Sequence, residues 1–270
     1  MSNDSLGDRM KSYEDVFRQR LPIRMPIIMR IDGKAFHSYV KGKSACGNEC
    51  KRPVDPGMTE CMNLTAIELC KEVQGCQIAY VQSDEISLLL NNYQAIDTQP
   101  WFDSNLQKMV SVAASIAGVT FTENSWKIWG HMCYDSASGD LHSDAIRKPA
   151  HFDCRAFVLP KDEVCNYFLW RQQDASRNSV QMLARSLFSH KECENKNNFE
   201  LQELCSQKGV NWSECPTSQR HGRCIVKQVT PHTAMNPQTG KYVTTQRSKW
   251  IVDNEIPVFS QNRQYIEQFT

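Results

Sequence analysis

Two acidic positions in this sequence have the chemistry to hold a metal ion. The stretch "QSDEIS" (82–87) places Asp84 and Glu85 between two apolar runs, and "MRIDG" (29–33) places Asp32 at the end of another. Carboxylate oxygens are ligands that hard cations such as Mg²⁺ prefer. Two Mg²⁺ ions held in this way organise nucleotidyl transfer, because one activates the attacking hydroxyl and both stabilise charge on the phosphate and the leaving pyrophosphate. The alternative reading is an Asp-Gly turn and an acidic hairpin tip on the surface.

The elements around these acids decide whether they meet. Apolar, partly β-branched runs predict buried strands, and apolar stripes at helical spacing predict helices. The predicted order is a strand at 25–31, a helix at 55–73, strands at 76–82 and 86–92, a helix at 104–121, a short strand at 128–134 and a strand at 152–160. This order is that of a ferredoxin-like (βαββαβ) α+β fold. Its first and third strands are antiparallel neighbours, so Asp32 and Asp84 should meet at one sheet edge although 52 residues separate them.

The rest of the chain predicts a mixed extension. A long helical pattern covers 162–188, a shorter one covers 197–209, and 223–252 contains alternating, β-like pieces. We therefore expect a core at 1–160 that carries the acids and a helical and β-hairpin extension at 161–270 that packs on this core.

Composition excludes several classes of protein. The 270 residues are 40% apolar and 23% charged, as in a globular protein, and the net charge of +1 leaves nucleic-acid binding to local basic patches. No apolar run reaches the roughly 18 residues that span a bilayer, and the polar N-terminus "MSNDSLGDRM" predicts no signal peptide. We expect a cytoplasmic protein with no membrane partner. Its 12 cysteines form no CxxC pair, and the spacing of Cys46, Cys50 and Cys61 is poor for zinc.

Several basic residues could either contact a triphosphate or simply lie exposed on the surface. The candidates are Lys34, Lys51, Arg52, Lys108 and Arg155. In the long helix, Arg171, Asp174 and Asn178 share one face because they are spaced i, i+3, i+7. This face, with neighbouring Arg177, is either an exposed intrahelical network or a nucleotide and phosphate contact.

Four motifs resemble the tRNA(His) guanylyltransferase superfamily, which adds nucleotides in the 3′-to-5′ direction to the 5′ end of tRNA. They are "RIDGKAFH" (30–37), "QSDEIS" (82–87), "FDCR" (152–155) and "YFLWRQQDASRNS" (167–179), in the family's order. The resemblance implies a polymerase palm-like core, a homotetramer, ATP, GTP and other nucleoside triphosphates as substrates, and tRNA as partner.

The resemblance also implies roles for individual residues. Asp32, the carbonyl of Gly33 and Asp84 would hold two Mg²⁺ ions, with Glu85 completing the catalytic carboxylates. The implied nucleotide-binding residues are Asp32, Gly33, Lys34, Ala35, Phe36, His37, Ser83, Asp84, Lys108, Arg155 and Asn178. Further triphosphate or tRNA contacts would come from Lys51, Arg52, Arg171, Asp174 and Arg177.

One departure from the family pattern distinguishes two functions. Eukaryotic members carry His-Ile-Asn-Asn in the long helix, where this chain reads Ser176-Arg177-Asn178-Ser179. The sequence is thus similar to the guanylyltransferase-like branch, which repairs 5′-truncated tRNA by template-dependent addition. The alternatives are a dedicated enzyme that adds G−1 to tRNA(His), a palm-fold nucleotidyl cyclase and a non-catalytic tRNA-binding module. The intact acids argue against the last of these.

Overall fold

The computed structural model describes residues 5–41, 53–130, 149–235, 240 and 242–270. Its centre is one antiparallel sheet in the order β4-β1-β3-β2-β5-β6. The strands are β1 (Ile27–Gly33), β2 (Cys76–Gln82), β3 (Glu85–Leu90), β4 (Phe152–Val158), β5 (Arg223–Met235) and β6 (Tyr242–Asp253). The predicted pairing of the first and third strands is confirmed, because β1 pairs with β3 from Ile27 to Asp32.

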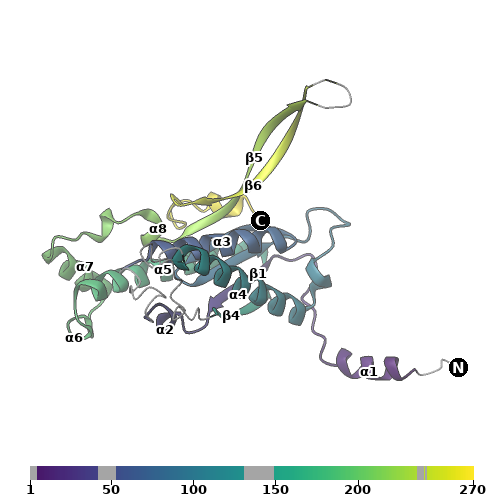
Figure 1. Ribbon diagram of the computed structural model, residues 1–270, viewed down its shortest axis with the longest axis horizontal. Coiled ribbons are helices and arrows are strands. Elements are labelled where there is room, and N and C mark those ends of the chain that lie inside the picture. Colours follow the sequence, from purple (N-terminus) through teal and green to yellow (C-terminus); the bar gives the residue numbers. More distant parts are fainter. Residues whose placement is uncertain (1–4, 42–52, 131–148, 236–239, 241) are drawn as a thin grey trace, which may run out of the picture.

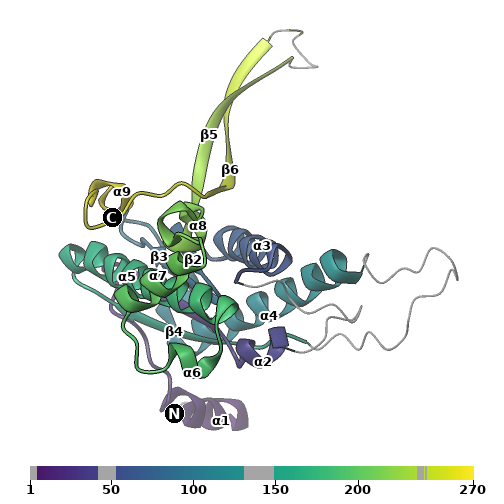
Figure 2. The same ribbon diagram turned by 90° about the vertical axis from the view of Figure 1, so that its left-hand side faces the viewer.

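Helices cover both faces of the sheet. Helices α3 (Pro56–Glu72) and α4 (Leu106–Gly130) lie on one face and α5 (Val164–Leu187) on the other, as Figure 2 shows. Strand alternation divides the apolar side chains between these layers. Met29 belongs to the core beneath α3 and α4, whereas its neighbour Ile28 packs with residues of α5.

Local sequence signals explain where α3 begins and ends. The Asp55 side chain accepts a hydrogen bond from the Met58 amide at 2.9 Å, and Pro56 occupies the first turn, where no backbone donor is needed. The chain then turns into β2 through Gly75, whose φ of +85° favours glycine. The predicted helix at 55–73 is confirmed.

Two sequence predictions need correction. Residues 128–130 form the last turn of α4, which is longer than expected, so the short strand predicted from residue 128 is wrong; residues 131–134 lie outside the described ranges. Strand β1 continues to Gly33, so Asp32 pairs within the strand. The apolar composition of α4 is continued by "SWKIW" (125–129), and that run resembles a strand in the sequence alone.

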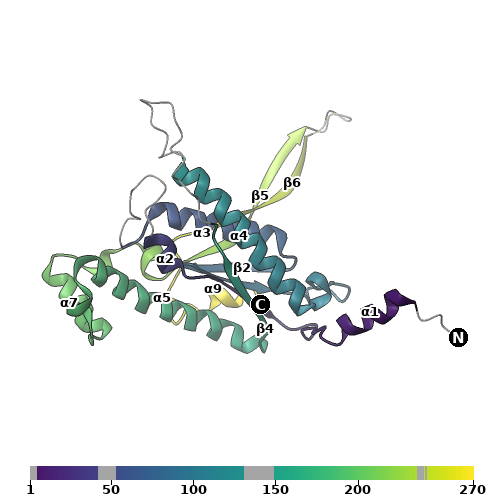
Figure 3. The same ribbon diagram turned by 60° about the horizontal axis from the view of Figure 1, so that its bottom comes forward.

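The C-terminal part continues the same sheet. Strand β5 pairs with β2 through Ala79–Val81, and its outer half forms with β6 a two-stranded ribbon that projects from the body (Figure 1). The predicted helices at 162–188 and 197–209 are confirmed as α5 and α7 (Asn198–Gln207). Helices α1 (Leu6–Asp15) and α7 lie at opposite ends of the molecule (Figures 1 and 3).

Short helices complete the described chain. They are α2 (Phe36–Lys41), α6 (His190–Cys193), α8 (Thr217–Arg220), α9 (Gln264–Glu267) and the 3-10 turns Trp101–Ser104, Lys161–Glu163 and Trp212–Glu214. Within the described ranges, no helix combines the length and apolar character needed to cross a bilayer.

Candidate active site

The sheet brings Asp32, near the end of β1, and Asp84, just before β3, to the same end of the sheet, here called its edge, as the sequence predicted. Asp32 lies opposite Glu85 in the β1–β3 ladder, and the Gly33 amide donates a hydrogen bond to the Asp84 carbonyl at 3.0 Å. Ser83 and Asp84 form the whole connection between β2 and β3, with Ser83 at a φ of +46°. The tight turn therefore fixes Asp84 beside the end of β1.

The local charge at this edge is strongly negative. Burial raises the pKa of Asp32, and repulsion from Asp84, Glu85 and Asp153 raises it further. Burial likewise raises the pKa of Asp84, with a further contribution from Glu85. Carboxylates that raise one another's pKa are stabilised by a bound cation.

The donor set at this edge fits magnesium bound together with a substrate. In the described part of the chain, no three or more His, Cys, Asp or Glu side chains converge to form a metal site by themselves. Mg²⁺ is commonly held through one or two carboxylates plus waters and substrate phosphates. Asp32 and Asp84, with the half-buried backbone at Gly33, supply the protein part of such a set.

A large cleft opens from these acids and is here named the carboxylate cleft. Its volume is about 1110 Å³, and it contains eight of the predicted nucleotide-binding residues. These are Asp32, Gly33, Ala35, Phe36, His37, Ser83, Asp84 and Asn178. The cleft continues along α5 to Arg185 and along the opposite wall to Arg223.

The Gly33–Phe36 segment forms the floor of the cleft. A Cβ atom at Gly33 would lie 2.4 Å from the Phe36 ring, so the close approach of ring and backbone requires glycine. Phe36 is 3% exposed and packs edge-on against Phe121. Its ring thus anchors the segment in the core while one side borders the cleft.

Glu85 points away from the cleft and forms a buried ion pair with the long helix. Arg171 donates to its two carboxylate oxygens at 2.8 and 2.6 Å, and Ser87 bridges from Glu85 to Tyr167. Burial opposes the charged form of Arg171, but the hydrogen bond and charge of Glu85 raise its pKa. Arg171 therefore connects α5 to the turn that carries the acids, and the structure does not direct it toward a triphosphate.

The rest of the predicted face on α5 is an intrahelical network. Asp174 accepts hydrogen bonds from Arg171 at 3.1 Å, Arg177 at 3.0 Å and Asn178 at 3.3 Å. Of these residues, only Asn178 lines the carboxylate cleft. Of the two predicted alternatives for this face, the intrahelical network, and not a nucleotide contact, describes Asp174 and Arg177.

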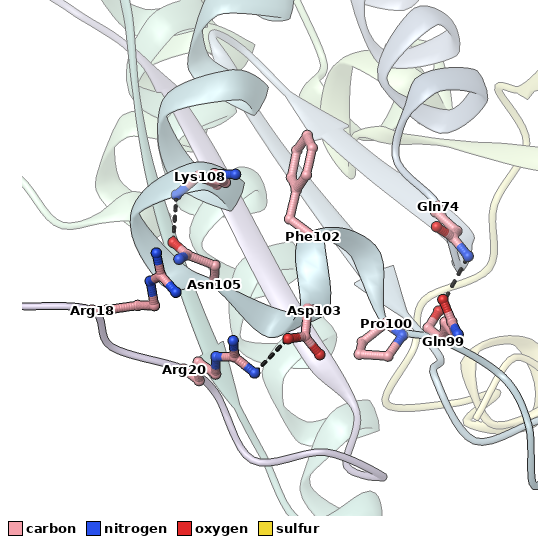
Figure 4. Close-up of a pocket in the computed structure, with 9 residues that line it drawn as sticks. All are labelled: Arg18, Arg20, Gln74, Gln99, Pro100, Phe102, Asp103, Asn105 and Lys108. Carbon is pink, nitrogen blue, oxygen red and sulfur yellow. Dashed lines mark hydrogen bonds and ion pairs between the residues drawn. The ribbon is translucent and has the colours of Figure 1, made fainter. Parts of the chain in front are cut away.

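The structure does not bring Lys108 to the carboxylates. Lys108 lies in the first turn of α4, whereas the far part of that helix, at Phe121, packs near Gly33 through Phe36. The intervening 13 residues of helix span about 20 Å. Figure 4 shows Lys108 in a separate pocket, where its amide binds the Asn105 side chain and where Arg20 pairs with Asp103.

Two further basic candidates lie near the edge but outside the cleft lining. Arg155 is exposed on β4, opposite Arg30 and 3.7 Å from Asp153. Lys34 is exposed, and its amide donates to the His151 carbonyl at 2.8 Å. The two remaining basic candidates, Lys51 and Arg52, lie outside the described residues.

Sequence reasoning missed three residues that the fold places around the site. Asp153 lies directly opposite Asp32 in the β1–β4 ladder and adds to the negative charge. Arg185 and Arg223 line the carboxylate cleft. A signal for Asp153 was present in "FDCR", and Arg185 follows Asn178 by seven residues, which places both on one face of α5.

The position of the absent family histidine has its own contact. The Ser176 hydroxyl lies 2.8 Å from Nδ1 of His221, which precedes β5 and stacks edge-on against Trp212. Burial, followed by the charge of Arg220, lowers the pKa of His221. This contact ties α5 to the far wall of the carboxylate cleft.

The fold and this acidic cleft belong to a nucleotidyltransferase. The family model described as tRNAHis guanylyltransferase matches residues 7–160, more than half of the chain, and the chain is a member of this tRNAHis guanylyltransferase family.

Individual relatives agree with this assignment. A bacterial tRNA(His) guanylyltransferase (Thg1)-like protein, solved in complex with ATP, is 41% identical with a TM-score of 0.80, and the match covers 98% of both chains. A structure of such a bacterial protein with GTP gives 40% identity and a TM-score of 0.76, covering 98% of this chain and 99% of the other. A probable tRNA(His) guanylyltransferase of Dictyostelium discoideum is 25% identical over 272 aligned positions, which cover 96% of this chain and 94% of that protein.

Proposed function

We propose that this enzyme is a template-dependent 3′-to-5′ nucleotidyltransferase that adds nucleotides to the 5′ end of truncated tRNA. The observation that carries the proposal is the convergence of Asp32 and Asp84 at the mouth of one large cleft. Solved Thg1-like relatives are in complex with ATP and GTP, which supports nucleoside triphosphates as substrates here. The strand order β4-β1-β3-β2 supports a palm-like core; the homotetramer stays an expectation from family resemblance.

The residues of the cleft have separate tasks in this proposal. Asp32, the Gly33 carbonyl and Asp84 would hold two Mg²⁺ ions, which supply Lewis-acid activation of the attacking hydroxyl and stabilise charge on the phosphates. The Gly33–His37 segment would carry the incoming nucleotide, and Asn178 would contact it from α5. Arg171 would keep Asp84 in place through its ion pair with Glu85.

The reaction joins the 3′-hydroxyl of an incoming nucleotide to the 5′ end of the RNA. A 5′-monophosphate is first activated with ATP to a 5′-adenylylated end, with release of pyrophosphate. The 3′-hydroxyl then attacks the RNA's 5′-phosphate, and AMP leaves. A 5′-triphosphate end needs no activation and releases pyrophosphate directly.

Template dependence is supported by the residues at 176–179, which lack the eukaryotic His-Ile-Asn-Asn pattern. A templated enzyme selects the nucleotide through base pairing and needs no guanine pocket. Contacts to the RNA backbone and helix shape carry no direct sequence information. Truncated tRNAs other than tRNA(His) should therefore be extended as well.

The experiment uses two tRNA species, each lacking its first nucleotide, with every NTP offered singly. Changing the opposite template base from C to A should switch the preferred nucleotide from G to U. The control is the same tRNA with the Asp32→Asn variant, which should extend neither template. Addition of G to tRNA(His) alone, whatever the template base, would overturn the proposal in favour of a dedicated guanylyltransferase.

A further inference from the structure

Arg223 is a buried guanidinium that has no acidic partner among the described residues. It lies at the first position of β5, its residue is 4% exposed, and it lines the carboxylate cleft. Its Nε donates to the Asn63 side-chain oxygen, and one terminal nitrogen donates to the Thr59 carbonyl at 3.2 Å. Among the described residues, no carboxylate oxygen lies within 4.0 Å of the Arg223 guanidinium, the limit for an ion pair.

Arg171, a buried arginine with a structural role, differs from Arg223 because it is paired with carboxylates. Its side chain is 7% exposed, and it contacts the carboxylates of both Glu85 and Asp174. The carboxylate whose charge acts on Arg223 is that of exposed Glu60, which accepts a hydrogen bond from the Asn63 amide at 3.4 Å. Burial lowers the pKa of Arg223 to about 10, which reflects this lack of direct compensation.

The backbone holds Arg223 firmly in place at the cleft wall. Gly222 has a φ of +78°, and a Cβ there would lie 2.6 Å from the Tyr80 hydroxyl and 2.8 Å from the Val81 carbonyl. Tyr80 in turn donates to the His221 carbonyl at 2.7 Å. The turn into β5 is thus fixed in place, and the hydrogen bonds to Asn63 and Thr59 then orient the guanidinium without an ion pair.

A buried cation is costly unless it is paired, so an uncompensated one at a cleft is a site for an anion. Arginine donates up to five hydrogen bonds in a fork that suits phosphate, and the two contacts to Asn63 and Thr59 leave donors free. Arg185, which has no ion pair among the described contacts, adds a second positive charge to the same cleft.

We propose that Arg223 is the centre of an anion subsite that takes a phosphate group of the substrate, apart from the metal-binding pair Asp32 and Asp84. The carboxylate cleft then has an acidic end for metal and a basic end for phosphate. Its volume of about 1110 Å³ exceeds that of a typical single small-molecule site of roughly 300–1,000 Å³. Only the carrier of this phosphate, a nucleoside triphosphate or the RNA 5′ end, rests on the proposed function.

The test measures binding of inorganic tripolyphosphate in EDTA, with neither RNA nor metal present, by thermal shift and calorimetry. Arg223→Gln should weaken binding about tenfold or more, as expected for loss of a charge-assisted hydrogen bond. The matched control is Arg263→Gln, which removes the same charge from an exposed arginine outside the cleft lining and should leave the affinity unchanged. Equal affinities of wild type and Arg223→Gln would overturn the subsite, whatever the enzyme's activity.

A second variant keeps the arginine and supplies the missing acid. Asn63→Asp would place a carboxylate at the Nε of Arg223, so it should raise the unfolding temperature and also weaken tripolyphosphate binding. A merely structural arginine would gain stability without any change in binding, and that result would overturn the proposal. This variant also decides the question should Arg223→Gln fail to fold.

Two further arms identify the carrier of the phosphate. The first compares 5′-phosphorylated with 5′-hydroxyl forms of one acceptor-stem RNA, and the second measures ATP in EDTA. Loss of the 5′-phosphate preference in Arg223→Gln assigns the subsite to the RNA end, whereas selective loss of ATP affinity assigns it to a nucleotide. A variant that matches wild type in both arms would contradict the proposal.

Discussion

Removing the guanidinium of Arg171 should strongly destabilise the fold, because it would leave the Glu85 carboxylate buried and unpaired. Both side chains are nearly inaccessible, at 7% and 11% exposure, and they share two hydrogen bonds of 2.8 and 2.6 Å. Breaking a buried pair by deleting one partner typically costs about 3–5 kcal/mol. For a domain of this size, that loss corresponds to a fall in Tm of about 6–20 °C.

The reverse deletion should cost less. In Glu85→Gln, Arg171 keeps the carboxylate of Asp174 at 3.1 Å, and Asp174 is partly exposed to water. Because the two substitutions remove one interaction, the double variant Arg171→Met/Glu85→Gln should be more stable than the sum of the single effects allows.

Urea unfolding of wild type, both single variants and the double variant completes the cycle, with free energies taken from linear extrapolation. Arg177→Met is the matched control, because Arg177 is an exposed arginine of the same helix that also pairs with Asp174; it should change stability by about 1 kcal/mol or less. A cost below about 1 kcal/mol for Arg171→Met, with additive effects in the double variant, would refute the role assigned to this pair.

The other predictions concern the acids, the cleft wall and the turn at β5. Asp32→Asn or Asp84→Asn should abolish nucleotide addition without loss of stability. Burial and repulsion raise the pKa of both carboxyl groups, so metal-free wild type should lose stability as pH rises through these pKa values. Urea unfolding at a series of pH values should show a shallower loss in either variant. His221 has a lowered pKa, so its contribution to folding stability should be complete above the unfolded-state pKa of about 6.5 and should decline as pH falls below that value. Thermal melts of His221→Asn should therefore show a weaker loss of stability toward acid pH, and the same loss as in wild type would contradict this. Gly222→Ala should destabilise by about 1–3 kcal/mol, because φ is +78° and the new methyl group meets the Tyr80 hydroxyl; equilibrium unfolding measures this cost, and a neutral result would show that the turn relaxes easily.

The sequence by itself determined the identity of the central acids and the order of elements, apart from the strand wrongly predicted from residue 128. Apolar runs and the Asp55–Pro56 cap specified strands and helices locally, since each depends on neighbours within one or two turns. Once that order was known, the adjacency of the first and third strands in a ferredoxin-like fold predicted that Asp32 and Asp84 would meet. Motifs of adjacent residues carried the family resemblance for the same reason.

Only the tertiary structure decided which charged side chains share a site. In the sequence, Glu85 cannot be distinguished in role from Asp84, nor Arg171 from Arg155. In the structure, Glu85 and Arg171 pair in the core, whereas Asp84 lines the carboxylate cleft. Asp84 lies in the turn whereas Glu85 begins β3, so the two adjacent acids have different surroundings, and the partner of Glu85 comes from α5, far away in the chain. Arg223 could not be singled out from the sequence, because its burial without an acidic partner among the described residues is a tertiary property that no local pattern records.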